Sequence, residues 1–429
     1  MEAPVAASSS AVTSDVAWYR TITREQWRVL VAAKFGWMVD SMDFWLYAMA
    51  IDQLRTYFGF GDATAGMLGT ATLVMSGVGG TIFGYVGDRF GRTRALTGTI
   101  LIFSFASLGA STSQSVMQLL LWRALLGIGM GGEWASGAVL VSESWPAAHR
   151  NKAISIMQSG WALGYMMAAL TAALILGSPS LGSDAWRWLF VAGVVPAFFT
   201  LWIRRYVREP EAWTRRRAST EAQKPFAAIF GPALLGRTLR IIALGGAVQF
   251  ANWGLFFWLP AFLARPVDQG GAGMGIVGSV SWLIPVQIGA YLGYLTFGFI
   301  ADRLGRRAAF VLYMLAAALL VPIYGQMART PMLLLVLGPL LGYFGYGYFS
   351  MFGSFVAELY PAAVRATGQG TSYNIGRMAG AIAPYTIGAV AALPGMGIGL
   401  ALSITSAFFL LAAILVFTLP DRSGQALDA

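Results

Sequence analysis

The sequence contains no cysteine and only one histidine, His149, among its 429 residues. Disulfide bonds, thiol nucleophiles and His/Cys metal sites are therefore excluded as the chemistry of this chain. Charge is also scarce, because Asp, Glu, Lys and Arg make up only 11% of the residues. Soluble domains carry about 25%. A chain with less than half of that fraction cannot cover a water-exposed surface of the usual kind.

Hydrophobic residues make up 57% of the chain and gather in long runs. Runs of roughly 17–25 residues are what an α-helix needs to cross a bilayer, whereas a membrane β-barrel would show alternating segments of about ten residues. We predict an all-α integral membrane protein with twelve transmembrane helices. Their predicted ranges are 28–52, 65–87, 95–113, 116–144, 152–177, 186–205, 239–263, 275–300, 308–327, 331–357, 366–390 and 396–418.

The basic residues predict which side of the membrane each loop faces. The net charge of +10 does not indicate nucleic-acid binding, because these residues lie in short loops between the apolar runs. With the N-terminus inside, the outer loops hold only Arg55, Arg187, Arg265 and Arg329. Cytoplasmic loops are enriched in Lys and Arg. We therefore expect a cell-membrane protein with both termini in the cytoplasm. The polar first 26 residues lack the apolar segment of a signal peptide, so we expect none that is cleaved.

Two loop motifs occur twice at nearly the same spacing. GYVGDRFGR at 84–92 returns as GFIADRLGR at 298–306, and ESWPAAHR at 143–150 returns as ELYPAAVR at 358–365. The repeat predicts two pseudo-symmetric six-helix bundles with a substrate path between them. The expected organisation is a disordered cytoplasmic tail at 1–26, bundles at 27–205 and 239–420, a basic cytoplasmic loop at 206–238 and a cytoplasmic tail at 421–429.

Three carboxylates fall inside apolar helices: Asp40, Asp43 and Glu133. Asp40 lies about 18 Å along its helix from Arg28, and residues three apart share a helix face. A lipid-facing Asp costs roughly 2.5–3.5 kcal/mol, so the pair must face a wet cavity or a partner. We expect these acids to bind and release a proton. The alternative is a structural pair, hydrogen-bonded to the fifth or eleventh helix.

Arg377 is the most informative cation, because it lies within the eleventh helix in the segment GTSYNIGRMAGA. A guanidinium offers two parallel donors that suit a carboxylate. We expect Arg377, with Asn374 and Tyr373, to bind a substrate carboxylate; an ion pair with Asp40, Asp43 or Glu133 is the alternative. Polar and aromatic residues at similar depth could line the same cavity or serve packing alone. They are Gln158, Trp161, Gln249, Asn252, Trp253, Gln287 and Tyr346.

The motif GxxxDRxGR after the second helix, Arg123 at the start of RALLGIGMGG, and twelve helices in two halves resemble the major facilitator superfamily. The segments WMVDSMDFWL, GIGMGGEW and SESWPAAHR are most similar to the sialate:proton symporter family, whose members carry organic acids. The related aromatic-acid:proton symporters also have paired aspartates in the first helix. The resemblance implies alternating access of a central site.

The resemblance also implies roles for further residues. Arg123 corresponds to an arginine associated with proton coupling or with anchoring neighbouring helices. The loop motifs correspond to segments that latch the two halves on the cytoplasmic side. The gating residues expected from them are Asp88, Arg89, Arg92, Glu143, Arg150, Asp302, Arg303, Arg306, Glu358 and Arg365.

These observations predict a monomeric transporter that takes up a small organic acid anion, such as a monocarboxylate, sialate or aromatic acid, together with a proton and without another cofactor. A sugar or polyol importer is the main alternative. Drug:proton antiport is disfavoured, because the fifth helix reads QSGWALGYMMAAL and lacks the glycine–proline run of such exporters. A sensor would need an output domain and an enzyme a nucleophile–base or metal set, so neither is expected.

Overall fold

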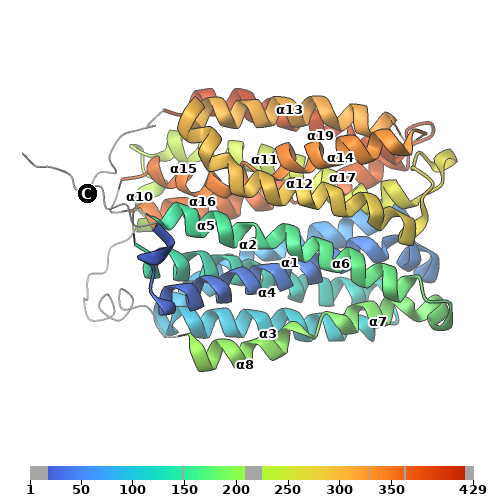
Figure 1. Ribbon diagram of the computed structural model, residues 1–429, viewed down its shortest axis with the longest axis horizontal. Coiled ribbons are helices and arrows are strands. Elements are labelled where there is room, and N and C mark those ends of the chain that lie inside the picture. The colour runs from blue at the N-terminus through green and yellow to red at the C-terminus, as the bar shows by residue number, and fades with distance from the viewer. Residues whose placement is uncertain (1–17, 147–148, 208–224, 328, 362–363, 421–429) are drawn as a thin grey trace, which may run out of the picture.

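The computed structural model describes residues 18–146, 149–207, 225–327, 329–361 and 364–420. In this part of the chain the regular elements are helices, and most run along one common axis (Figure 1). Both ends of the described chain, near Trp18 and Leu419, lie at the left in Figure 1. We call this end the terminal end and the opposite end the distal end.

The first group of helices occupies one side of the molecule (Figure 1). It consists of α1 (Arg24–Phe58), α2 (Asp62–Phe90), α3 (Arg92–Ser111), α4 (Val116–Ser144), α5 (Arg150–Gln158), α6 (Gly160–Leu176), α7 (Ala185–Ala192) and α8 (Pro196–Tyr206). The second group consists of α11 (Leu235–Ala264), α12 (Gly275–Leu304), α13 (Arg306–Gln326), α14 (Pro331–Tyr346), α15 (Phe349–Glu358), α16 (Arg365–Gly380), α17 (Ala383–Ala391), α18 (Gly397–Leu402) and α19 (Ile404–Leu415). The short helix α10 (Pro225–Ile229) precedes it.

Five of the twelve predicted helices are interrupted. The breaks separate α5 from α6, α7 from α8, α14 from α15, α16 from α17 and α18 from α19. Pro196 and Pro384 stand in the first turns of α8 and α17, where a proline's missing N–H is tolerated. Among the described residues, eight helices are long and apolar enough to span a membrane. Three of the remaining predicted spans are divided between shorter helices: α7 and α8, α14 and α15, and α16 and α17.

Equivalent helix pairs in the two groups pack through glycine. In the first group, a Cβ atom on Gly131 of α4 would overlap the carbonyl oxygen of Ser76 on α2. In the second group, a Cβ atom on Gly342 of α14 would overlap the carbonyl oxygen of Val286 on α12. Backbone-to-backbone approach of this kind is how membrane helices gain packing without a hydrophobic drive. The two groups therefore use the same close backbone contact between equivalent helices, α2 with α4 and α12 with α14.

The two groups meet along a seam formed by α1, α2 and α6 on one side and α11, α12, α16 and α17 on the other. Gly66 of α2 lies against the backbone of Pro384 and Tyr385. The Tyr165 hydroxyl of α6 donates a hydrogen bond to the Phe256 carbonyl of α11, 3.3 Å away. Lys34 of α1 places its ammonium 5.3 Å from the ring centre of Tyr291 on α12. Residues on these helices can therefore contact a molecule held between the groups.

Replacing Gly131 with alanine should lower the stability of the protein, because the added methyl group overlaps the α2 backbone. Overpacking of this kind costs about 1–3 kcal/mol, more than the ~1 kcal/mol that alanine gains over glycine within a helix. The measurement is the apparent unfolding temperature in detergent. Gly84→Ala is the matched control, since a Cβ atom there meets no atom within 4 Å. Equal unfolding temperatures for the two variants would contradict the prediction.

Candidate functional site

The two aspartates of α1 are buried but have different neighbours. Asp40 is 0% exposed and Asp43 is 1% exposed. The Ser107 hydroxyl of α3 lies 2.5 Å from the Asp43 Oδ1 atom. Neither carboxyl oxygen of Asp40 has a hydrogen-bond partner among the residues described. Asp40 interacts electrostatically with Asp43 and with Arg377 of the opposite group. Asp43 therefore faces α3, whereas Asp40 interacts with a cation across the seam.

Glu133 of α4 is the third buried acid and lies against α1. It is 0% exposed, and its Oε1 atom would lie 2.6 Å from a Cβ atom placed on Gly36. Glycine at position 36 thus leaves the space that the carboxyl group fills. Within the described part of the chain, neither oxygen of Glu133 has a hydrogen-bond partner. Its electrostatic neighbour is Asp40, so the three acids predicted from the sequence form one cluster.

Arg123 of α4 is held by aromatic rings. Its guanidinium carbon lies 4.3 Å from the ring centre of Tyr47 and 5.5 Å from that of Phe44, both on α1. The guanidinium interacts electrostatically with Asp43. Its three nitrogens have no hydrogen-bond partner among the described residues. Cation–π contacts therefore position this side chain as a charge neighbour of Asp43.

Arg377 of α16 reaches from the second group into the first. It is 1% exposed, and its Nη1 atom lies 3.4 Å from the Ser76 hydroxyl of α2. The Nη2 atom lies 3.4 Å from the hydroxyl of Tyr373, whose ring centre is 5.0 Å from the guanidinium carbon. The Asn374 amide points at Gly80 of α2. The three residues predicted to bind a carboxylate are thus buried together at the seam.

The charges of this cluster nearly balance. Asp40, Asp43 and Glu133 supply three acidic groups, and Arg123 and Arg377 supply two cations. An ion at lipid depth is costly unless neighbouring charges or hydrogen bonds compensate it. With all three acids ionised the cluster carries one excess negative charge, so a single bound proton makes it neutral. The arrangement is suited to the reversible binding of one proton.

An aromatic wall adjoins the charged cluster. The ring centres of Trp161 on α6 and Trp253 on α11 are 5.8 Å apart, and Phe44 lies 5.0 Å from Trp253. Trp37 lies 4.6 Å from Trp161. The indole nitrogens of Trp37 and Trp253 are buried without a hydrogen-bond partner among the described residues. Aromatic faces with a few unsatisfied polar atoms are typical of a small-molecule cavity.

The remaining polar residues predicted for the cavity are buried as well. Gln158, Gln249, Gln287 and the Tyr346 hydroxyl each have a side-chain polar atom without a partner in the described structure. Asn252 differs, because its amide donates to the Gly345 carbonyl at 3.1 Å. This bond connects α11 to α14 and is a packing contact. Buried polar atoms without a protein partner are normally satisfied by water or a ligand. The three glutamines and Tyr346 therefore remain candidates for lining the cavity.

Two polar contacts are described for the residues predicted to gate the terminal end, and both lie within the first group. Arg92 of α3 lies 3.5 Å from Glu143 of α4, and Arg89 donates to the Tyr85 hydroxyl at 2.7 Å. Arg150, Asp302 and Arg303 are exposed, and Arg306 is half-buried. The side chains of Asp88, Glu358 and Arg365 lie outside the described set. A latch between the two halves at this end stays a prediction.

The sequence analysis missed a cluster of ion pairs at the distal end. Arg265, at the end of α11, lies 2.7 Å from Asp52 of α1 and 2.8 Å from Asp62 of α2. Arg55 of α1 lies 3.3 Å from Asp52 and 3.1 Å from Asp62. We call these four residues the distal clamp, because Arg265 joins the second group to the first. Arg55 and Arg265 are two of the four arginines that the sequence analysis assigned to outer loops. Their isolated positive charge in these loops could have indicated the clamp.

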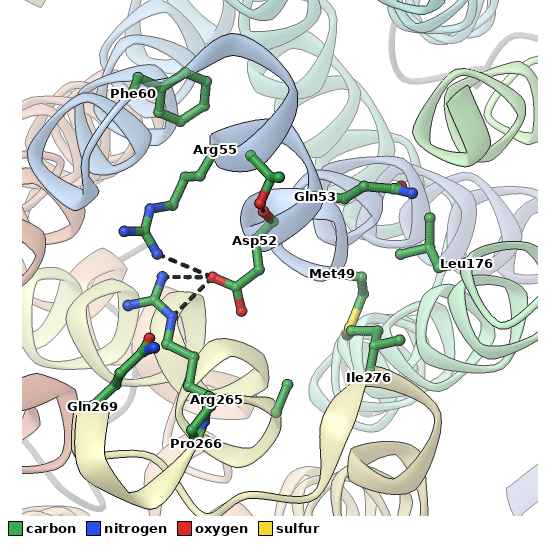
Figure 2. A pocket seen from close by; sticks show the side chains of 12 residues that line it. Met49, Asp52, Gln53, Arg55, Phe60, Leu176, Arg265, Pro266, Gln269 and Ile276 are labelled. Carbon is green, nitrogen blue, oxygen red and sulfur yellow. Dashed lines mark hydrogen bonds and ion pairs between the residues drawn. The ribbon is translucent and has the colours of Figure 1, made fainter. Parts of the chain in front are cut away.

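The distal clamp borders a pocket of about 620 Å³. Figure 2 shows Asp52 between Arg55 and Arg265, with Met49 and Ile276 on the apolar side of the pocket. Burial lowers the pKa of Arg265, but the charges of Asp52 and Asp62 and their hydrogen bonds outweigh it and raise that pKa above its ordinary value. The Arg265 side chain is 6% exposed, against 40% for Asp52. Arg265 is therefore a permanently charged, largely buried anchor.

Comparison with known proteins places the chain among transporters. Residues 35–285 match the Major Facilitator Superfamily. The chain is 30% identical to the cis,cis-muconate transport protein of Acinetobacter baylyi, over 87% of this chain and 90% of that protein. It is 26% identical to a sialic acid transporter of Escherichia coli, over 95% and 97%. These matches confirm the family expected from the sequence motifs.

The solved structures include the same fold. A D-xylose–proton symporter superposes with a TM-score of 0.75 at 19% sequence identity, covering 94% of this chain and all of that one. At this identity the likeness concerns the fold alone. It confirms the predicted all-helical membrane architecture.

Replacing Arg265 with alanine should open the distal pocket, because the clamp then loses its contact between the two groups. The native chain has no cysteine, so Met49→Cys, a residue 2% exposed in the pocket wall, provides a single reporter. We expect its labelling by a membrane-impermeant maleimide to rise about tenfold, which corresponds to ~1.4 kcal/mol lost from the clamp. Arg329→Ala, an exposed arginine near the end of α13, is the control. Unchanged labelling after Arg265→Ala would contradict the prediction.

Proposed function

Because the chain belongs to the Major Facilitator Superfamily, a family of transporters, we propose that it is a symporter that moves a small organic acid anion together with a proton. The observation that carries this proposal is the buried cluster of three acids and two arginines at the seam. The proton taken up with the anion offsets the anion's charge, so the loaded centre carries no more net charge than the empty one and can reorient in the membrane at a comparable cost.

The second half of the proposal concerns the substrate. Arg377 is a cation of the second group that contacts Ser76 of the first group. A carboxylate bound to its guanidinium would accept two parallel hydrogen bonds and would lie between the two halves. The relatives named for muconate and sialic acid transport support an organic acid as the cargo. Tyr373, Asn374 and the tryptophans of the aromatic wall would enclose its remaining atoms.

The same proposal includes orientation and assembly. The basic loops between the apolar helices favour a cytoplasmic terminal end, so the distal clamp would face the outside and the proton would enter from there. A single chain contains both halves and the whole candidate site, which supports a monomer as the working unit. We propose no cofactor apart from the coupling proton, and the lipid bilayer is the only other partner that the sequence calls for.

The coupling proposal predicts that Asp43→Asn abolishes uptake driven by a pH gradient, because the amide cannot bind and release a proton. Purified protein in proteoliposomes, with an acidic exterior and radiolabelled cis,cis-muconate or sialic acid, provides the measurement. We expect accumulation to fall at least tenfold while exchange of internal for external substrate continues. Asp268→Asn, an exposed residue near the distal end, should behave like the native protein. Full gradient-driven accumulation by Asp43→Asn would refute the role of this acid.

The substrate proposal predicts that Arg377→Ala removes the stabilisation that an organic acid gives to the protein. Charge-assisted hydrogen bonds contribute about 1.5–3 kcal/mol, so affinity should fall at least tenfold. The measurement is the ligand-induced thermal shift of the purified protein with cis,cis-muconate or sialic acid, with Arg329→Ala as control. An uncharged sugar such as xylose should give no shift with the native protein. A sugar that stabilises the native protein, with organic acids inactive, would favour the alternative of a sugar importer.

A further inference from the structure

Ser107 of α3 connects Asp43 to a helix break. It is 1% exposed, and its hydroxyl oxygen lies 2.5 Å from the Asp43 Oδ1 atom and 3.1 Å from the Phe190 carbonyl oxygen. Phe190 belongs to α7, which ends two residues later, and Gly193 follows. A Cβ atom on Gly193 would overlap both Asp43 and Ser107. The break after α7 thus brings the Phe190 carbonyl close to Asp43. In the described structure Asp43 has a hydrogen-bond partner, whereas Asp40 has none.

The number of hydrogens at this contact depends on the charge of Asp43. A serine hydroxyl has one hydrogen to donate, whereas an ionised carboxylate and a carbonyl are acceptors only. If Asp43 is ionised, Ser107 can donate to one of its two neighbours but not to both. If Asp43 is protonated, its O–H donates to Ser107, and Ser107 donates to the Phe190 carbonyl. Both short contacts are hydrogen bonds only in the protonated arrangement.

The charged groups around Asp43 act in opposite directions. On α1 its neighbours are Asp40, a like charge, and Tyr47; from α4 it faces Arg123. Arg123 lies on the rings of Tyr47 and Phe44 and, among the described residues, donates no hydrogen bond. The Asp43 Oδ2 atom also has no hydrogen-bond partner in this part of the chain. Glu133 and Arg377 interact with Asp40. Asp43 thus has one like charge and one cation nearby, and the number of donors at Ser107 is what favours its protonated form.

We propose that Ser107 is the positioning residue that retains the coupling proton on Asp43, by accepting a hydrogen bond from the protonated carboxyl and donating one to the Phe190 carbonyl. This inference rests on the proposed proton symport and deepens it, because it names Asp43 as the acid that carries the proton in this conformation. It also gives Ser107 a role that its position in an apolar helix did not suggest.

The test measures substrate uptake into proteoliposomes as a function of external pH. Uptake needs a protonated Asp43, so it rises as the pH falls, with a midpoint set by the affinity of that carboxyl for the proton. Ser107→Ala removes an acceptor that stabilises the protonated form, and the midpoint should move to lower pH. One hydrogen bond corresponds to about 0.5–1 pH unit. Ser107→Thr retains the hydroxyl and should restore the native midpoint.

Ser104→Ala is the matched control, because Ser104 is a buried serine one turn away on α3 and its hydroxyl has no partner among the described residues. Its midpoint should equal that of the native protein. A shift of the Ser107→Ala midpoint to higher pH would mean that Ser107 donates to an ionised Asp43, and it would overturn the inference, as would no shift. In both cases symport would stand. Native uptake that is indifferent to the pH gradient would instead overturn symport and the inference together.

Discussion

The structure depends on one constraint, which is that ionised groups at the depth of the lipid chains must be compensated by the protein itself. Each uncompensated carboxylate or guanidinium there costs at least roughly 2.5–3.5 kcal/mol. The protein meets the constraint by gathering Asp40, Asp43, Glu133, Arg123 and Arg377 at the seam, where each is at most 1% exposed. Glycines at helix contacts leave room for these charged side chains. Gly36 leaves room for the Glu133 carboxyl, and Gly193 lets the end of α7 approach Asp43.

The distal clamp, at the loop end of the helices, pairs its charges in a form that can be reversed. Arg55 lies within 3.3 Å of Asp52 and within 3.1 Å of Asp62, and all three residues belong to the first group. If Arg265 withdraws with the second group, both carboxylates keep a cationic partner, and Arg265 enters the aqueous pocket. Breaking the contact between the groups therefore leaves no bare buried carboxylate, which would otherwise be strongly destabilising. Arg55 thus remains as a second cationic partner for both carboxylates when Arg265 is displaced.

The sequence predicted the helices and the buried acids because apolar run length and charge at lipid depth are local properties. It left the partners of these acids open, with an ion pair between Arg377 and one of the three acids as an alternative. Residues three apart share a helix face, yet Asp43 faces α3 while Asp40 interacts with Arg377 of α16. Which neighbour each one meets depends on how helices far apart in the chain pack. The distal clamp was missed for the same reason, since Arg265 and Asp52 are 213 residues apart. The helix breaks depend on tertiary packing as well as on proline.

The helix packing follows the sequence repeat, whereas the positions of the charged residues do not. A Cβ atom on Gly127 of α4 would overlap the Thr72 carbonyl of α2, just as one on Gly342 would overlap the Val286 carbonyl of α12. These positions are related by the spacing of the sequence repeat, so the scaffold follows the duplication. The charged cluster does not: the repeat pairs Glu133 with Tyr348 and Arg123 with Gly338. Gly338 packs against Val286 of α12, so the second group uses for packing the position that the first group uses for a cation. The three acids thus belong to one group, while Arg377 of the other provides the cation that faces them. A symmetric arrangement would divide the charges equally between the two halves, whereas here a cation of the second group faces acids of the first across the seam.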